Sequence, residues 1–313
     1  MELSLLPIEL IELITSKVKD TSSIRITCRQ WRDIVHHNTK QLLWRDRQPV
    51  NQLPAMNRLP AMNLSGLMTL ICSDANITDL DPLAVCTQLK KLDFSNNPVL
   101  DLSGLGNCIQ LEYISCTRTM VADLSQVVNF PRLHTMKCNR TNVVNLAPLA
   151  ACTQLEKLDF SRTSVADLGP LAACTSLKNL DFSRTMVVNL IHFPRLQTLK
   201  CNKTSVTYLG PLAACTSLKT LDCSSTRVVF LGPLTSCKEL RTLNCAATWV
   251  ADLGPLSRCT RLEHLVCFDT EVSDLSPLRF TRLVKMKCDL GLSDQVEELV
   301  KICTGLQVEF SDA

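Results

Sequence analysis

The sequence has no long hydrophobic run and no strong excess of one charge. None of its apolar stretches approaches the ~18 residues that a membrane-spanning helix needs. It carries 33 basic and 30 acidic residues, a net charge of +3, so it lacks the broad field that attracts nucleic acids or anionic membranes. The start, MELSLLPIELIELI, has neither a basic segment nor a small-residue cleavage site, so we expect no signal peptide. These absences predict a protein inside the cell that has no membrane partner and does not favour nucleic acid.

Recognisable catalytic motifs are also missing. The sequence has no glycine-rich loop for phosphates, no histidine pair at metal-ligand spacing, no nucleophile elbow and no Cys-x-x-Cys pair. His36 and His37 are adjacent and therefore project differently, and the other three histidines are scattered. We expect neither an enzyme, nor a cofactor, nor a metal site.

The sequence does contain a repeat. The stretch LGPLAACTSLK occurs at residues 168–178 and again at 209–219. A leucine opens each of eleven units, and most steps between these leucines are 22 residues, with one of 19 and a last one of 21. The opening leucines are Leu67, Leu89, Leu111, Leu133, Leu155, Leu177, Leu196, Leu218, Leu240, Leu262 and Leu283. This periodicity predicts a solenoid, whose stacked turns bury an edge that no single turn could bury alone.

The unit from Leu155 shows the pattern within one turn. Leu158 and Phe160 alternate as in a short strand, and later apolar residues follow at spacings of three, which favours an extended or 3-10 return path. This pattern resembles leucine-rich repeats of the 22-residue class, seen in internalins and in regulatory subunits of nuclear protein phosphatase. The resemblance covers about residues 64–290. It implies an α/β repeat solenoid, an arc of about 11 turns with short parallel strands and a convex side of short irregular or 3-10 segments.

The repeats differ from that family at one polar position. The family usually has an asparagine eight residues after the opening leucine, and its side chain bonds the backbone of adjacent turns. Here only Asn97 fits, and a threonine takes the position in most other turns. These residues are Thr119, Thr141, Thr163, Thr185, Thr204, Thr226, Thr248 and Thr270. Because a hydroxyl can both donate and accept, we predict a structural ladder of threonines.

The seventeen cysteines would suggest disulfides in a secreted protein, but their positions indicate a core. Eight stand five residues after an opening leucine, at a position that phenylalanines such as Phe160 share. Seven occupy a second inward position, which Phe280 and two other phenylalanines share. Since free cysteine packs as a small hydrophobe, we predict that fifteen are core residues. The compartment is then reducing, the cytoplasm or nucleus of a eukaryotic cell.

Residues 291–313 predict a C-terminal cap. The stretch SDQVEELVKICTG favours a helix with Ser293 as its N-cap and Gly305 at its end, and LQVEF favours a last strand. We expect Cys303 on the buried side of that helix. Together the helix and the strand would cover the open end of the solenoid, as repeat arrays require.

Residues 1–48 do not follow the repeat and resemble an F-box. They predict two helices, the second starting near Ile24. The F-box signature is a Leu-Pro pair, an acidic residue two further on, apolar residues at helical spacing, a Cys-Arg-x-Trp run and a terminal Leu-Trp. The matching residues are Leu6, Pro7, Glu9, Leu10, Ile14, Val18, Cys28, Arg29, Trp31, Leu43 and Trp44. The connector between the helices is about two residues shorter than in that family.

The F-box resemblance implies that Leu6, Pro7, Leu10 and Ile14 contact a Skp-type adaptor, which links the chain to a cullin-RING ubiquitin ligase. The chain would then be the substrate-recognition subunit of a Skp-cullin-F-box ligase, with a target protein on the solenoid. The alternative is a ligase-independent interaction scaffold whose N-terminal helices only cap the solenoid. Residues 49–63, in which LPAMN occurs twice, are the expected semi-rigid linker.

One set of side chains on the expected concave binding face is basic and not required by the fold. Seven residues after the opening leucine, five consecutive turns carry Arg118, Arg140, Arg162, Arg184 and Lys203. One interpretation is that each pairs with a nearby aspartate and only solvates the surface. The other is that the set binds an acidic or phosphorylated target, because guanidinium groups bind carboxylate and phosphate in a bidentate manner.

A second set is aromatic, in a chain with only 4% aromatic residues. Tyr208 and Phe230 replace the common Asp or Asn twelve residues into the unit, and Trp249 and Phe268 follow in neighbouring turns. Exposed aromatic side chains on adjacent turns are typical interface anchors. Local core packing explains them equally well at this stage.

Overall fold

The computed structural model describes residues 24–26, 41–44 and 65–311. The predicted adaptor-binding residues Leu6, Pro7, Leu10 and Ile14, together with the linker 49–63, lie outside the described residues. The chain divides into two compact units, Met1–Leu155 and Glu156–Ala313. No described helix combines the length and apolar character that would span a bilayer.

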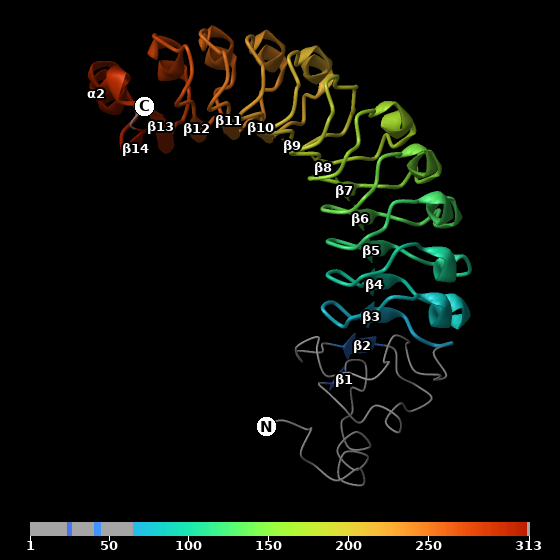
Figure 1. The fold of residues 1–313 in the computed structure, drawn as a ribbon. Coiled ribbons are helices and arrows are strands. Elements are labelled where there is room, and N and C mark those ends of the chain that lie inside the picture. The colour runs from blue at the N-terminus through green and yellow to red at the C-terminus, as the bar shows by residue number, and fades with distance from the viewer. Residues whose placement is uncertain (1–23, 27–40, 45–64, 312–313) are drawn as a thin grey trace. The chain divides into compact units, whose positions relative to one another are not determined.

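In the first unit, short strands pair in parallel in chain order (Figure 1). Between β3 and β6 partners are 22 residues apart, as with Leu70 and Leu92. The strands are β1 (Ile24–Ile26), β2 (Gln41–Trp44), β3 (Thr69–Ile71), β4 (Lys91–Asp93), β5 (Tyr113–Ser115) and β6 (Thr135–Lys137). The return segments contain 3-10 helices at Asp81–Val85, Ser103–Leu105, Ser125–Asn129 and Ala147–Ala151.

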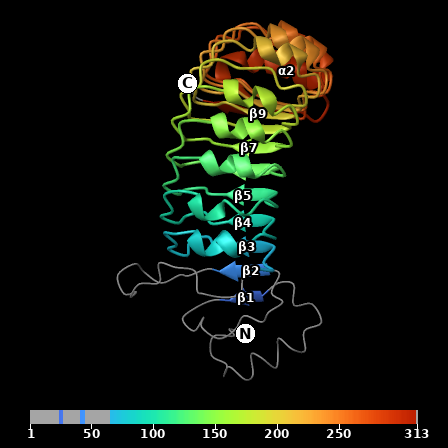
Figure 2. The ribbon, with the colours of Figure 1, turned by 90° about the vertical axis from the view of Figure 1, so that its right-hand side faces the viewer.

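The second unit continues the same pattern up to the C-terminal helix (Figures 1 and 2). Its strands are β7 (Lys157–Asp159), β8 (Asn179–Asp181), β9 (Thr198–Lys200), β10 (Thr220–Asp222), β11 (Thr242–Asn244), β12 (His264–Val266), β13 (Lys285–Asp289) and β14 (Gln307–Ser311). The 3-10 helices are Gly169–Ala173, Gly210–Ala214, Gly232–Ser236, Gly254–Arg258, Ser276–Phe280 and Leu290–Leu292, and the α-helix is α2 (Ser293–Ile302). The predicted leucine-rich-repeat solenoid, with parallel strands and 3-10 return segments, is confirmed.

The turn from Leu240 shows why the sequence folds this way. Leu243 on β11 and Cys245 directly after it alternate with exposed or half-buried residues, and both are fully buried in the core. After the strand the chain returns to Asp252, whose Oδ1 accepts a hydrogen bond from the backbone N–H of Gly254 at 2.6 Å. This bond and a proline in the first helical turn start the 3-10 helix Gly254–Arg258. This turn thus buries one apolar edge and caps its own return segment.

The predicted cysteine core is confirmed. The fifteen cysteines at the two repeat positions are all buried. One assignment at the second position is wrong, because Phe280 is 53% exposed and Thr281 is buried in its place. The buried position lies three residues after the preceding leucine, so Thr281 takes it after Leu278, and the residue missing from the last step falls between Thr281 and Leu283. The Thr281 hydroxyl donates to the Leu278 carbonyl.

The threonine ladder forms, but its hydrogen bonds differ from those of asparagine. Asn97 accepts bonds from the backbone N–H groups of Ala75 and Ile77 in the preceding turn, at 3.0 and 2.9 Å. Each ladder threonine instead donates to a carbonyl three residues earlier in its own turn, as Thr163 does to Phe160 at 2.7 Å. The threonine side chain is shorter and carries one polar atom, which binds a carbonyl of its own turn. The asparagine amide is longer and reaches backbone N–H groups of the neighbouring turn.

Two described segments of the N-terminal region are strands. The predicted helix is wrong at Ile24, which lies in β1, and Leu43 and Trp44 lie in β2. β1 pairs with β2 and β2 with β3, so that Ile24 and Leu70 are both in register with Leu42. The Ile-Arg-Ile sequence is β-branched and alternating, which favours a strand where a sheet edge offers unpaired backbone groups.

The C-terminal helix and the last strand are present as predicted, and Cys303 is buried. Ser293 is not the N-cap. The 3-10 helix Leu290–Leu292 runs directly into α2, so Leu292 is the capping residue and Ser293 is already helical. Gly305 follows the helix with a φ of 87°, a conformation that glycine adopts without strain.

Candidate functional site: the exposed edge of the repeats

The five predicted basic residues lie in the turn that follows each strand rather than on the strand itself. All five are exposed, and all adopt left-handed backbone conformation, with φ between 56° and 58°. Arg118 and Arg140 belong to the first unit, whereas Arg162, Arg184 and Lys203 belong to the second. They therefore line the edge of each unit where the strand ends.

The left-handed conformation has a structural reason, but the basic side chain does not. It directs the N–H of Arg184 to the Asn202 carbonyl of the next turn at 2.8 Å. Other turns have Asp74, Asn96 and Asp269 in the same conformation at this place. Asp and Asn tolerate it better than Arg does, so the backbone does not require a positive charge here.

The expected pairing of these cations with strand aspartates is wrong for four of them. Asp181 accepts hydrogen bonds from the N–H and hydroxyl of Ser183 at 3.0 and 2.7 Å, and Asp222 binds Ser224 in the same way. Among the described residues, no ion pair includes Arg118, Arg140, Arg184 or Lys203. Their charges face solvent.

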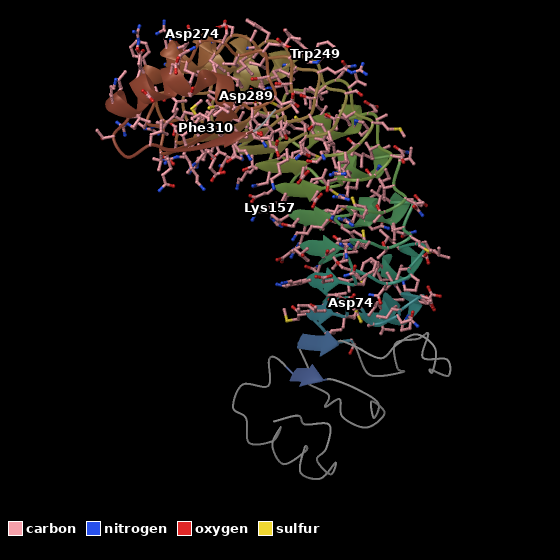
Figure 3. The ribbon with its side chains drawn as sticks, turned by 60° about the vertical axis from the view of Figure 1, so that its left-hand side comes forward. Asp74, Lys157, Trp249, Asp274, Asp289 and Phe310 are labelled. Atoms are coloured by element: carbon pink, nitrogen blue, oxygen red, sulfur yellow. The ribbon has the colours of Figure 1, made fainter. Side chains whose placement is uncertain are left out.

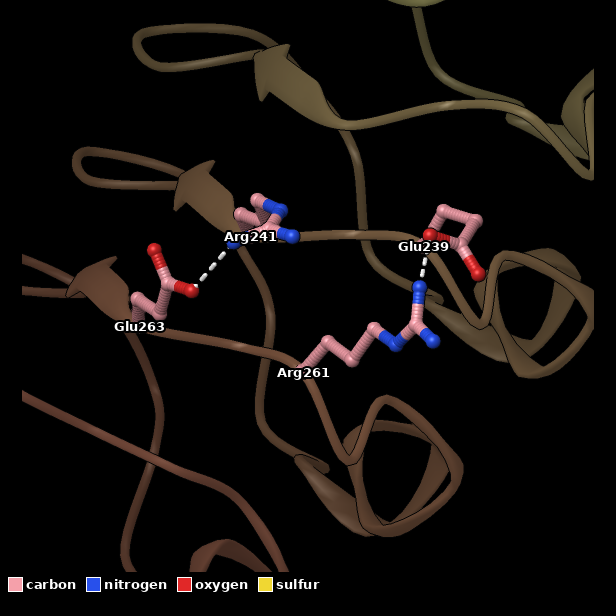
Figure 4. Close-up of polar contacts among 4 residues, drawn as sticks. All are labelled: Glu239, Arg241, Arg261 and Glu263. Atoms are coloured by element: carbon pink, nitrogen blue, oxygen red, sulfur yellow. Dashed lines mark hydrogen bonds and ion pairs between the residues drawn. The ribbon is translucent and has the colours of Figure 1, made fainter.

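The ion pairs that do form lie elsewhere and join neighbouring turns. Arg241 pairs with Glu263 at 2.6 Å just before β11 and β12, and Arg261 pairs with Glu239 beside them (Figure 4). Lys178 and Glu156 pair at 2.6 Å at the corresponding place near β7 and β8. Because these pairs lie before the strands, they leave the edge after the strands uncompensated.

Tyr208 and Phe230 stand where most turns have the Asp or Asn that starts the 3-10 helix. Both side chains are exposed, by 66% and 58%. Each ring lies against the glycine two residues later, so closely that a Cβ added to Gly210 or Gly232 would overlap the ring. The aromatic side chains thus replace a polar cap with a contact that only glycine permits.

Trp249 and Phe268 have different environments. Trp249 is 61% exposed and projects from the surface of the second unit (Figure 3), so core packing does not explain it. Phe268 is partly buried, and the ammonium of Lys287 lies 4.9 Å from its ring centroid. This cation–π contact gives Phe268 a local structural partner, and Trp249 is the stronger candidate for a binding residue.

The cysteine column has no features of a reactive site. Burial, and to a smaller extent Asp222, raises the pKa of Cys223 to about 12. Burial and the neighbouring thiols likewise raise the pKa of Cys201 and Cys245 well above their usual range. A neutral thiol is a poor nucleophile and a poor metal ligand. Within the described residues, no group of His, Cys, Asp and Glu could hold a metal ion.

A family model of leucine-rich repeats in two copies matches residues 67–107. No curated protein matches this chain. An internalin of Listeria monocytogenes, InlF, is 19% identical with a TM-score of 0.66, over 80% of this chain and 82% of that one. The functional domain of InlJ from the same species is 25% identical with a TM-score of 0.62, over 80% of this chain and 51% of that one, and it includes a cysteine ladder. This chain therefore spans about half of the InlJ structure.

A plant receptor has the same fold. The leucine-rich-repeat ectodomain of the Arabidopsis thaliana receptor kinase GASSHO1/SCHENGEN3, in complex with CASPARIAN STRIP INTEGRITY FACTOR 2, is 13% identical with a TM-score of 0.59, over 87% of this chain and 37% of that one. Together with the family model, these structures establish the leucine-rich-repeat fold.

Proposed function

We propose that this chain is a protein-binding module whose exposed repeat edge holds a target protein. The observation that carries the proposal is the combination of Arg184 and Lys203, exposed and outside every ion pair of the described residues, with exposed Tyr208, Phe230 and Trp249 on neighbouring turns. Arginine and large aromatic side chains are both enriched at protein interfaces, and an exposed lysine beside them adds charge complementarity to an acidic partner. The GASSHO1/SCHENGEN3 complex supports the proposal as an example of this fold with a bound partner.

More specifically, we propose that the chain is the substrate receptor of a Skp-cullin-F-box ligase in the cytoplasm or nucleus. The sequence supports this form, because its N-terminal residues match the F-box signature in the same order. Leu6, Pro7, Leu10 and Ile14 would then contact the adaptor. The solenoid would bring the lysines of its target close to the ubiquitin-charged enzyme and perform no chemistry itself. Such an arrangement acts through proximity.

The second candidate is a ligase-independent scaffold, and one observation favours it. Since β1 and β2 extend the parallel ladder from β3, the segments Ile24–Ile26 and Gln41–Trp44 add two strands to the end of the first unit. A segment with that role stabilises a solenoid whether or not it binds an adaptor. The two candidates differ in what the N-terminal residues contact.

Direct binding of the purified full-length chain to a eukaryotic Skp-type adaptor distinguishes them. The receptor predicts submicromolar affinity that Leu6→Ala/Pro7→Ala/Leu10→Ala abolishes. A well-folded chain that does not bind contradicts the receptor.

A further inference from the structure

We propose that one edge of the second unit binds an acidic peptide segment with large apolar side chains, presented by a partner protein. We name this surface the aromatic edge and define it by Arg184, Lys203, Tyr208, Arg227, Phe230 and Trp249. The proposal rests on the protein-binding function above, and it specifies where the partner docks and which chemistry it presents.

Backbone hydrogen bonds place the first two cations on stacked neighbours. The N–H of Arg184 donates to the Asn202 carbonyl at 2.8 Å, and the N–H of Lys203 donates to the Ser224 carbonyl at 2.9 Å. Asn202 directly precedes Lys203 in the chain. Arg184 and Lys203 therefore lie one turn apart, about 4.8 Å in the ladder direction.

The third cation lies beside the first aromatic residue. The N–H of Arg227 donates to the carbonyl of Val206 at 3.0 Å, and Tyr208 follows Val206 by two residues. The same bond recurs one turn later, where the N–H of Trp249 donates to the carbonyl of Val228 at 3.0 Å. Phe230 follows Val228 by two residues, so it lies two residues along the chain from the carbonyl that Trp249 binds.

The aromatic side chains are exposed, and two of them lie against glycine backbone. Tyr208, Phe230 and Trp249 are 66%, 58% and 61% exposed, far more than packing within the unit would leave. The rings of Tyr208 and Phe230 rest on glycine backbone, at positions where a Cβ would collide with them. An aromatic side chain has only two side-chain torsions, so it loses little conformational entropy when a partner covers it. Such a ring is suited to anchor an apolar side chain.

The charge on this edge determines the class of partner. Arg184, Lys203 and Arg227 are exposed, and no ion pair of the described residues includes them. On the turns of Tyr208 and Phe230 the aromatic residue has also removed the carboxylate that other turns carry at the start of the 3-10 helix. The aromatic edge is therefore positive, and carboxylates are its complement.

The turns that follow have the opposite charge. The corresponding positions after β11 and β12 carry the exposed residues Asp252, Asp269, Glu271 and Asp274. An acidic partner would be repelled there, whereas it is attracted one turn earlier. This reversal confines the site to the turns that open at Leu177, Leu196 and Leu218, together with Trp249 in the first part of the next turn.

Apolar neighbours favour a polypeptide over a nucleic acid. Met186 and Val229, which lie beside the cations in sequence, are 62% and 54% exposed. A phosphate backbone forms ionic contacts with the cations but does not bury aliphatic surface. An acidic segment with Leu, Met or Phe both forms ionic contacts with the cations and buries the aliphatic side chains. Binding of nucleic acid to the same surface is therefore an alternative that the experiment below tests.

A library of random 12-residue peptides displayed on phage, selected on the immobilised full-length chain, tests the proposal. We expect the selected peptides to combine Asp or Glu with large apolar residues. Synthesised with a fluorescent label, they should bind about tenfold or more weakly to Tyr208→Asn/Phe230→Asn. This variant should fold, because Asn145 occupies the same position and accepts a bond from the N–H of Ala147 at 2.9 Å.

A second variant, Arg184→Gln/Lys203→Gln/Arg227→Gln, should weaken binding similarly and flatten its salt dependence. Val144→Asn, at an exposed apolar position of the first unit, is the matched control and should bind as the unaltered chain does.

Three results would overturn the proposal. The first is a selection that returns no peptides or peptides without acidic residues. The second is a set of peptides that bind both variants as well as the unaltered chain, which would leave the protein-binding function standing and place the site elsewhere. The third is a labelled single-stranded DNA oligonucleotide that binds more tightly than the selected peptides and is lost in both variants.

Discussion

The ring of Tyr208 lies against the backbone of Gly210, and the same contact recurs between Phe230 and Gly232 one turn later. In other turns an aspartate occupies the position of the ring, as Asp167 does when it accepts a bond from the N–H of Gly169 at 2.8 Å. The glycine belongs to the repeat, since it also follows Asp167 and Asp252, and its missing side chain leaves room for the ring. The exchange replaces a charged cap with an exposed ring.

Gly210→Ala should displace the Tyr208 ring and cost about 1 kcal/mol of unfolding free energy, because the added methyl group occupies the place of the ring. The matched control is Gly169→Ala, where the new Cβ meets only the flexible Asp167 carboxylate at 3.1 Å and the cost should be less than half as large. Urea unfolding measures both. Equal effects of the two substitutions would show that the ring does not rest on Gly210.

Asn97→Thr should lower the unfolding free energy by about 2 kcal/mol. Threonine keeps a bond within its own turn but leaves the N–H groups of Ala75 and Ile77 without the Oδ1 acceptor. Thr119→Val removes only the 2.8 Å bond to the Cys116 carbonyl and should cost about 1 kcal/mol. Chemical denaturation of both variants checks the order, which a smaller loss for Asn97→Thr would contradict.

Arg140→Asn should raise the unfolding free energy by roughly 0.5–1 kcal/mol, because asparagine tolerates the left-handed conformation better than arginine. Asn96 already occupies the equivalent position two units before Arg140, and its φ is 57°. Thermal unfolding measures the change. An unchanged or lower melting temperature would show that the Arg140 side chain itself stabilises the turn.

The buried cysteines should make the protein less stable at alkaline pH. An exposed thiol ionises near its ordinary pKa of 9.0, whereas burial raises the pKa of Cys223 in the folded protein to about 12. Between these values the unfolded chain has lost protons that the folded chain still holds, so the free energy of unfolding falls as pH rises. The stabilisation is complete below pH 9 and is lost toward pH 12.

Thermal unfolding between pH 8 and 11 measures this dependence. The variant Cys201→Ala/Cys223→Ala/Cys245→Ala should be less stable at pH 8 but show a shallower decline. An identical slope in the variant would show that thiol ionisation does not contribute.

The repeat period determined most of what could be predicted. Spacing of the leucines located the strands, the 3-10 segments and the two cysteine columns, because burial repeats with the chain period. The error at Phe280 came from assuming that period in a step that is one residue shorter. The error at Ile24 came from reading helical periodicity where a three-residue strand pairs with a neighbour far along the chain, a tertiary effect that local pattern does not contain.

The candidate site was only partly predictable for a related reason. The sequence located the basic residues and the exposed aromatic residues but not the conformation or partners of either. Whether Arg184 pairs with Asp181 depends on Ser183, which occupies that carboxylate through bonds within its own turn. The glycines after Tyr208 and Phe230 were an available signal, since an aromatic residue two positions before a glycine recurs in adjacent turns. Arg227 lies outside the basic positions of the other turns and was missed.

Affinity purification of the tagged full-length chain from eukaryotic cells, followed by quantitative mass spectrometry, tests most directly whether the molecule joins a ligase to a target. The account predicts that a Skp-type adaptor and a cullin are lost only from Leu6→Ala/Pro7→Ala/Leu10→Ala, and that a distinct partner with an acidic segment is lost only from Tyr208→Asn/Phe230→Asn. If both variants retain the same proteins as the unaltered chain, the account is contradicted.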